Sequence, residues 1–191
     1  MEALFVSTGV IALAEIGDKT QLLAFILAAR FKKPLPIIAG ILAATLLNHG
    51  IAGVFGAWIT TVISPDIMRW VLGGSFIAMA IWTLIPDKIE EEETQIAGKL
   101  GVFGATFVTF FLAEMGDKTQ IATVAMAAHY AAPFLVIMGT TLGMLIADVP
   151  AVFVGNKFAT KIPMKLVHSI AAGIFAVMGL LTLFQADKLF T

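Results

Sequence analysis

Two short runs of polar residues interrupt an otherwise apolar sequence, and each combines two carboxylates with a lysine. We call these runs the twin motif; they read Glu15-Ile16-Gly17-Asp18-Lys19-Thr20-Gln21 and Glu114-Met115-Gly116-Asp117-Lys118-Thr119-Gln120. A charged side chain at the centre of a bilayer costs about 2.5–3.5 kcal/mol on insertion scales. Helix packing does not require this cost twice in one chain, so we interpret the twin motif as the working site.

The side chains of the twin motif offer oxygen ligands, without sulfur or imidazole. We expect a metal site of four carboxylates with hydroxyl and amide groups beside them: Glu15, Asp18, Glu114 and Asp117, then Thr20, Thr119, Gln21 and Gln120. Such hard donors suit Ca²⁺, Mn²⁺ or Mg²⁺ better than Zn²⁺ or Cu²⁺. Gly17 and Gly116 permit a local break that would free backbone carbonyls as further ligands.

The two lysines balance part of this charge. In a continuous helix Glu15, Asp18 and Lys19 share one face, and the second copy repeats the spacing. With Lys19 and Lys118 charged, four ionised carboxylates leave a net charge of −2, which one divalent cation neutralises. A purely structural alternative treats Glu15–Lys19 and Glu114–Lys118 as ion pairs between successive turns, but it leaves both aspartates unpaired.

The composition identifies the broad class of protein. Of 191 residues, 59% are hydrophobic and 13% are charged. A soluble domain carries about 25% charged residues. We therefore expect an all-α, polytopic protein of the lipid bilayer, with no nucleic-acid partner and no attached soluble domain. The absence of cysteine excludes disulfides and thiolate metal sites, and the first apolar run is too long for a signal peptide.

Six apolar runs are long enough to be transmembrane helices. They cover residues 3–29, 36–62, 67–85, 100–128, 134–156 and 166–185. Proline or charge marks every break between them, as expected at helix ends. The first and fourth runs would be about 40 Å long as straight helices, which exceeds the ~30 Å hydrocarbon core. They must therefore tilt or break, and a break would fall at Gly17 and Gly116.

An internal repeat with an offset of 99 residues organises these runs. Besides the twin motif, it aligns Pro34 with Pro133, Gly40 with Gly139 and Gly56 with Gly155. The sequence thus predicts a first three-helix repeat at 1–86, an acidic linker at 87–99 and a second repeat at 100–191. The linker is a solvated connection or a weak cation-collecting segment.

Because each repeat holds three helices, the second must enter the membrane from the opposite side. The loops after the odd-numbered helices hold eight lysines and arginines and the other side holds two: Arg30, Lys32, Lys33, Lys88, Lys99, Lys157, Lys161 and Lys165 against Arg69 and Lys188. The positive-inside rule then predicts that the odd-numbered loops are cytoplasmic and that both termini lie outside the cytoplasm. We expect a multi-pass protein of the cell's inner membrane. Inverted repeats bring the two motifs together at the membrane midplane, as in many transporters.

Three further polar residues lie near mid-depth in the second and fifth runs. These are Asn48, His49 and Asp148, and Asp148 falls at the position that matches His49. One interpretation is hydrogen bonding between helices. The other is a role in proton transfer or in orienting the metal ligands, because histidine titrates near neutral pH and Asp148 could be its partner.

Two copies of E-x-G-D-K-[ST], each on the first helix of a three-helix repeat and joined by an acidic loop, resemble a known family. It is the cation-transporter family of the Golgi manganese and calcium transporters of eukaryotes, which includes short bacterial manganese exporters. The resemblance covers essentially the whole chain. It implies a secondary transporter, without enzymatic activity or bound cofactor, that exports Mn²⁺ in exchange for protons through Glu15, Asp18, Glu114 and Asp117. The oligomeric state is left open.

Other functions fit the residues less well. A Ca²⁺/H⁺ exchanger of the same architecture stays open, because the ligand set does not separate Ca²⁺ from Mn²⁺. An intramembrane aspartyl protease would use Asp18 and Asp117 as a dyad, but has no use for the repeated glutamates and lysines. A channel usually builds its filter as a ring from symmetric subunits, and a sensor would need an output domain.

Overall fold

The computed structural model describes residues 1–85, 100–154 and 164–184, and within these ranges all regular structure is α-helix. The all-α prediction is thus confirmed. The helices there are α1 (Glu2–Glu15), α2 (Lys19–Phe31), α3 (Pro34–Val62), α4 (Pro65–Thr83), α5 (Gly101–Glu114), α6 (Lys118–Tyr130), α7 (Pro133–Val154) and α9 (Met164–Phe184). The predicted acidic linker at 87–99 lies outside the described residues.

Proline fixes the starts of three of the four long helices in the described part of the chain. Pro34, Pro65 and Pro133 are the first residues of α3, α4 and α7, where the missing N–H costs nothing and the fixed φ suits the first turn. The helices of the second half begin 99 residues after their counterparts: α5 after α1, α6 after α2, α7 after α3 and α9 after α4. The offset seen in the sequence therefore recurs in the helix boundaries.

The first and fourth apolar runs are not single helices. Each is broken at the twin motif, between α1 and α2 and between α5 and α6. Gly17 and Gly116 have φ values of +85° and +79°, a left-handed conformation that a helix does not continue through and that favours glycine. The predicted sharing of one helix face by Glu15, Asp18 and Lys19 is therefore wrong, because the chain changes direction between the first two.

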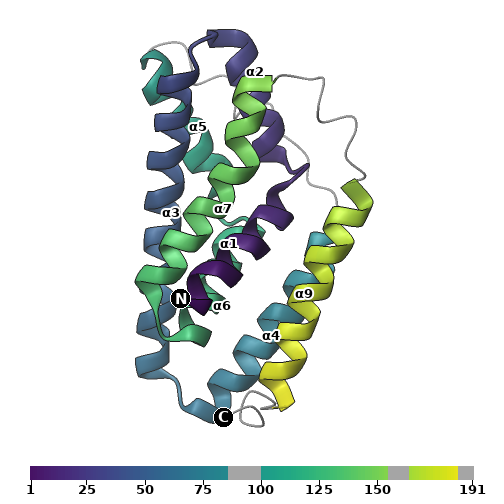
Figure 1. Ribbon diagram of the computed structural model, residues 1–191. Helices are drawn as coiled ribbons and strands as arrows, with labels where there is room; N and C mark the ends of the chain where they lie inside the picture. The colour runs from purple at the N-terminus through teal and green to yellow at the C-terminus, as the bar shows by residue number, and fades with distance from the viewer. Residues whose placement is uncertain (86–99, 155–163, 185–191) are drawn as a thin grey trace.

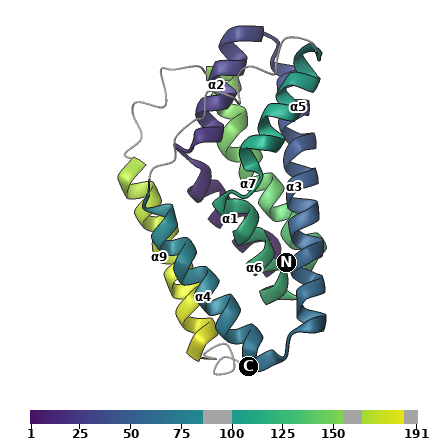
Figure 2. The same ribbon diagram turned by 180° about the vertical axis from the view of Figure 1, so that it is seen from behind.

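The broken helices run in opposite directions between two apolar clusters (Figures 1 and 2). The lower cluster in Figure 1 includes Ile11 of α1 and Met126 of α6; the upper cluster includes Leu23 of α2 and Phe110 of α5. The chain thus passes from the lower to the upper cluster at the first motif and from the upper to the lower at the second. Both motifs lie at the boundary between the clusters.

Each broken helix packs closely against a long helix from the other half of the chain. A Cβ added to Gly40 of α3 would collide with Thr106 of α5, and one added to Gly139 of α7 would collide with Ser7 of α1. Gly139 lies 99 residues after Gly40, and Thr106 lies 99 residues after Ser7, so the repeat relates the two contacts to each other. These glycines let backbones approach closely, as small residues do between membrane helices.

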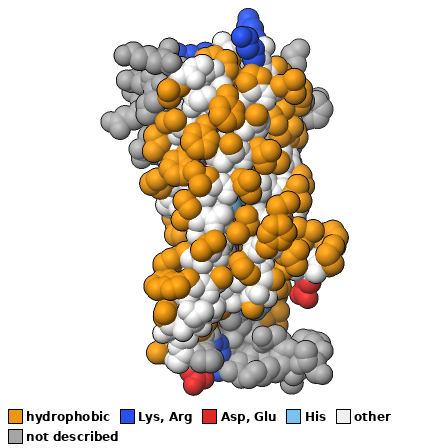
Figure 3. Space-filling model, turned by 90° about the vertical axis from the view of Figure 1, so that its left-hand side faces the viewer, with side chains coloured by type: hydrophobic (Ala, Val, Ile, Leu, Met, Phe, Trp, Pro, Cys, Tyr) orange, Lys and Arg blue, Asp and Glu red, His pale blue; other side chains and the backbone are white. Residues whose placement is uncertain are grey.

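The exterior of the bundle is apolar while its centre is charged. On the face in Figure 3, hydrophobic side chains cover the bundle and the charged side chains lie towards its two ends. Ile51, Val54 and Trp58 on α3 are each more than half exposed. By length and composition, α3 and α7 could each cross a membrane alone. The halves α1, α2, α5 and α6 have 13 or 14 residues, about 20 Å, and are too short to do so singly.

Candidate metal site

The breaks in the two helices have the same hydrogen bonds. Past each glutamate, the aspartate N–H donates to the glutamate carbonyl, at 3.0 Å from Asp18 to Glu15 and 3.1 Å from Asp117 to Glu114. Each aspartate is then the N-cap of the following helix, where its carboxylate accepts from a backbone N–H. A negative group at this position is stabilised by the unpaired amides and the helix dipole.

The two glutamine side chains hold the breaks closed. Gln21 Oε1 accepts from the Gly17 N–H at 2.9 Å, and Gln120 Oε1 accepts from the Gly116 N–H at 2.8 Å. The Gln21 amide also donates to the carbonyl of Ala147 at 2.9 Å, which ties the first break to α7. The sequence predicted these oxygens as metal ligands; in the structure each accepts from a backbone N–H of its own motif, and the role as a ligand stays a prediction.

The glutamates are fully buried, and each accepts from a threonine of its own motif. Thr20 Oγ1 donates to Glu15 Oε2 at 2.6 Å and Thr119 Oγ1 donates to Glu114 Oε2 at 3.0 Å. The other oxygen of each glutamate, Oε1, has no hydrogen-bond partner among the described residues. A buried carboxylate oxygen without a partner is costly. The threonines therefore orient the glutamates and leave one oxygen of each for a ligand.

Three of the four predicted carboxylates meet in one group. One oxygen each from Glu15, Glu114 and Asp117 lies within 4.8 Å of the other two, and all three residues are buried. The group combines carboxylates from both motifs, although the motifs are 99 residues apart in the sequence. Such a cluster of oxygen donors has the chemistry of a site for a hard divalent cation. Asp18 is not part of this group.

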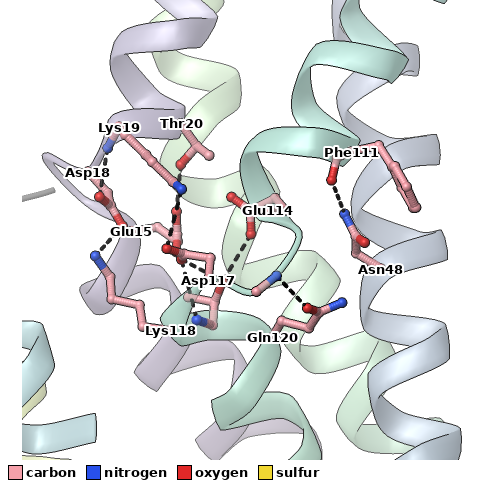
Figure 4. Close-up of polar contacts among 12 residues, drawn as sticks. Glu15, Asp18, Lys19, Thr20, Asn48, Phe111, Glu114, Asp117, Lys118 and Gln120 are labelled. Atoms are coloured by element: carbon pink, nitrogen blue, oxygen red, sulfur yellow. Dashed lines mark hydrogen bonds and ion pairs between the residues drawn. The ribbon is translucent and has the colours of Figure 1, made fainter. Parts of the chain in front are cut away.

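The lysines pair with the aspartates of the opposite motif (Figure 4). Lys19 Nζ lies 3.6 Å from Asp117 Oδ1, and Lys118 forms an ion pair with Asp18 Oδ2. The structural alternative considered above, with Glu–Lys pairs inside each motif, is therefore wrong, and so is its consequence that the aspartates lack partners. The crossed pairs also exclude the Asp18–Asp117 dyad that a protease would need, because each aspartate faces a lysine.

Asn48, His49 and Asp148 are all buried, at 1% exposure or less. The Asn48 amide donates to the carbonyl of Phe111 at 3.1 Å, and Figure 4 shows this bond on the α3 side of α5. Because α5 ends at Glu114, the Met115 N–H turns to Leu112 instead of Phe111, and Asn48 satisfies the carbonyl that is left. For Asn48, the predicted interhelical hydrogen bond is confirmed.

His49 and Asp148 differ from Asn48. Neither ring nitrogen of His49 and neither carboxylate oxygen of Asp148 has a hydrogen-bond partner in the part of the chain that the structure describes. Asp148 is close enough to Glu114 and Asp18 for their charges to interact. No hydrogen bond joins His49 to Asp148 within that part, and their role in proton transfer stays a prediction.

Two buried hydroxyls escaped the sequence analysis. Thr45 of α3 and Thr141 of α7 are at most 4% exposed, and their Oγ1 atoms have no hydrogen-bond partner among the described residues. Thr45 precedes Asn48 by three residues and Thr141 precedes Asp148 by seven, so each shares a helix face with a polar residue already singled out. Helical spacing from those residues was the signal that could have found them.

Comparison with known sequences identifies the family. The profile described as "Divalent cation/proton antiporter GDT1" matches residues 3–91 and 102–189, which is nearly the whole chain. The chain belongs to the GDT1 family. The resemblance stated from the twin motif is thereby confirmed, as are the predictions of a transporter and of no enzymatic activity. Membership in GDT1 also means that the chain is a membrane protein of a family of divalent cation/proton antiporters.

Individual GDT1 relatives cover most of the chain. A Vibrio cholerae protein named "Putative manganese exporter" is 52% identical over 185 residues, which are 96% of this chain and 92% of the relative. A GDT1-like protein of Synechocystis is 30% identical over 193 residues, 90% of this chain and 92% of the relative. GDT1-like protein 3 of Oryza sativa is 29% identical, with 91% and 71% covered. No solved structure matches the chain at a significant level.

Proposed function

We propose that the protein is a secondary transporter that exports Mn²⁺ from the cytoplasm in exchange for protons. The observation that carries this proposal is the group of Glu15, Glu114 and Asp117, whose oxygens lie within 4.8 Å of one another in the buried centre of an apolar bundle. Hard carboxylate oxygens suit Mn²⁺ and Ca²⁺ alike. The name of the Vibrio cholerae relative favours Mn²⁺, and Ca²⁺/H⁺ exchange is the second candidate.

The proposed architecture has six spans in two inverted three-helix repeats, residues 1–86 and 100–191. In it, α1 with α2 and α5 with α6 form two broken spans, and α3, α4, α7 and α9 form the other four. The opposite directions of the broken helices and the 99-residue offset between helix starts support this plan. So do the crossed ion pairs, because each maps onto the other under the same offset. Broken helices around a central site are a feature of alternating-access transporters.

The proposed orientation puts both termini outside the cytoplasm, in the inner membrane of a bacterial cell. Among the described residues, Arg30, Lys32 and Lys33 lie at the end of the bundle where α2 ends, whereas Arg69 lies near the start of α4 at the other end. This distribution agrees with the positive-inside rule. The remaining loop lysines counted in the sequence, apart from Lys165 in α9, lie outside the described residues.

Charge balance suggests the coupling. The group of three carboxylates carries −3 when ionised, Lys19 contributes +1, and the Asp18–Lys118 pair is neutral. One M²⁺ neutralises the remaining −2, and so do two protons. An empty, charged site is costly to move through a low-dielectric surround, so we infer that two protons return for each cation. Close carboxylates titrate as a set, so no single residue owns either proton.

His49 and Asp148 are the proposed route for these protons. Both are buried without hydrogen-bond partners in the described structure, and Asp148 interacts electrostatically with Glu114. Buried ionisable groups without partners in a membrane protein are typical of proton relays. A neutral exchange of two protons requires that Asp148 has the same protonation state before and after each cycle.

Flux into liposomes that contain the purified protein tests the proposal. We expect uptake of ⁵⁴Mn that saturates with concentration and is driven by a pH gradient, with ⁴⁵Ca as the competing substrate. Faster ⁴⁵Ca than ⁵⁴Mn uptake would favour the Ca²⁺/H⁺ exchanger. Flux that does not saturate and ignores the pH gradient would indicate a channel and contradict the proposal.

A further inference from the structure

The two crossed ion pairs are equivalent in sequence but unequal in their surroundings. The Lys118 and Asp18 side chains are 2% and 1% exposed, whereas Lys19 is 17% exposed and its partner Asp117 is 3% exposed. Symmetric residues in unequal surroundings are expected when a transporter faces one side. The pair of Lys19 with Asp117 is thus the more accessible of the two.

The partners of the two lysines also differ in what else they do. Asp117 belongs to the group of three carboxylates, and Asp18 does not. With Nζ at 3.6 Å from Asp117 Oδ1, the Lys19 ammonium borders the position that a metal ion would take. A cation that binds Asp117 must therefore compete with Lys19, while Lys118 can stay on Asp18.

We propose that Lys19 is the resident counter-cation of the metal site, which a divalent ion displaces from Asp117, and that Lys19 thereby excludes monovalent cations. This inference rests on the proposed function and assigns the selectivity of the same site. A free Na⁺ or K⁺ gains no charge by replacing a tethered ammonium and also loses translational freedom. A divalent cation is attracted to Glu15, Glu114 and Asp117 twice as strongly as a monovalent ion at the same distance. Displacement of the ammonium is therefore favourable for a divalent cation and not for a monovalent one.

The same competition assists release. When the protein exposes the site to the other side, the tethered ammonium can return to Asp117 and displace the ion. A lysine suits this task because its compact charge sits on a flexible stem. Removal of the ammonium should therefore tighten binding and slow turnover together. A residue that only positions the ligands would instead weaken binding when it is removed.

The test compares Lys19→Met with Lys118→Met, which removes the same charge at the position related by the repeat. Binding of Mn²⁺ to purified protein is measured by titration calorimetry, with and without added Na⁺ or K⁺. We expect Lys19→Met to bind Mn²⁺ at least about tenfold more tightly in low salt and to become sensitive to monovalent ions. Its ⁵⁴Mn turnover should fall. Lys118→Met should show a clearly smaller gain in affinity and a lower melting temperature, because it leaves Asp18 buried without its cation.

A charge-conserving variant completes the design. Lys19→Arg keeps a cation at the position, so we expect its affinity and its resistance to monovalent ions to return to those of the wild type. If Lys118→Met does not fold, the contrast between Lys19→Met and Lys19→Arg still decides. If the wild-type protein transports Mn²⁺ but Lys19→Met binds Mn²⁺ equally well or more weakly than the wild type, the inference about Lys19 is overturned and the proposed function is not. A wild-type protein that neither binds nor transports Mn²⁺ would overturn the proposed function as well.

Discussion

Replacement of Glu114 by glutamine should slow transport at least tenfold without harming the fold. Glu114 is fully buried, one of its oxygens accepts from Thr119, and the other has no partner among the described residues. In Glu114→Gln the amide oxygen can still accept from Thr119, so the orientation of the side chain is kept. Only the ligand charge is lost.

The size of the effect follows from the geometry of the carboxylate group. At an effective dielectric constant of about 20, one carboxylate about 2.4 Å from a divalent ion contributes about 14 kcal/mol of attraction. In the empty site, Glu15 and Asp117 lie within 4.8 Å of Glu114, and loss of its charge relieves repulsion of about 7 kcal/mol if all are ionised. The net loss of binding free energy is the lost attraction minus the relieved repulsion. It is reduced further because the empty site binds protons and because the neutral amide oxygen can still act as a ligand. A tenfold loss of affinity needs only about 1.4 kcal/mol, so at least tenfold slower ⁵⁴Mn uptake is expected.

The assay measures ⁵⁴Mn uptake into liposomes together with the melting temperature from tryptophan fluorescence. The melting temperature of Glu114→Gln should equal or exceed that of the wild type, because a buried charge is removed from beside others of the same sign. Glu2→Gln, an exposed glutamate at the start of α1, is the matched control and should transport normally. Normal transport by Glu114→Gln would refute the central site. A large fall in its melting temperature would mean that Glu114 is structural.

Four other expectations can be tested in the same preparation. Gly116→Ala should cost about 1–2 kcal/mol of folding stability, because Gly116 has a φ of +79°, and it should slow transport. The control Gly50→Ala, with nothing within 4 Å of its added Cβ, should stabilise α3. Equal changes in stability and transport in the two variants would contradict the role of the break. Cysteines at Ser64 and Glu91 should label from opposite sides of the membrane, and labelling of both from outside would break the inverted topology. A large excess of Mg²⁺ should compete poorly with ⁵⁴Mn, because Mg²⁺ gives up water reluctantly; competition at similar concentrations would refute this. A potassium–valinomycin potential at equal pH should hardly change the flux, and a steep dependence would exclude exchange for two protons.

Much of the helical framework could be predicted from local signals. Pro34, Pro65 and Pro133 mark helix starts at the residue where each lies, because the missing N–H and the fixed φ act through the chain itself. The position of the break at Gly17 was also within reach, since a straight helix was too long for the bilayer. Whether the chain would tilt or break was not, because both solutions satisfy the same length.

The pairing of charges could not be predicted in the same way. Spacing within one helix places Lys19 beside Glu15, but that geometry assumes a continuous helix, and the left-handed Gly17 removes it. Lys19 meets Asp117 because α2 and α5 are packed together by contacts far apart in the sequence. The packing of α3 against α5 likewise brings Asn48 to the Phe111 carbonyl, which is left over only because α5 stops. Long-range contacts of this kind leave no periodic trace in the sequence.

The crossed ion pairs have a consequence for biogenesis. Asp18 finds its cation on Lys118, 100 residues further along the chain. At about 5–20 residues per second, roughly 5–20 s pass before the ribosome delivers it. Until then Asp18 lacks that cation, and the helices of the first half lack the helices of the second half against which they mainly pack. The nascent first half is therefore the stage at which membrane chaperones and quality-control proteases have the most to recognise, and truncation after the third span should give a short-lived product.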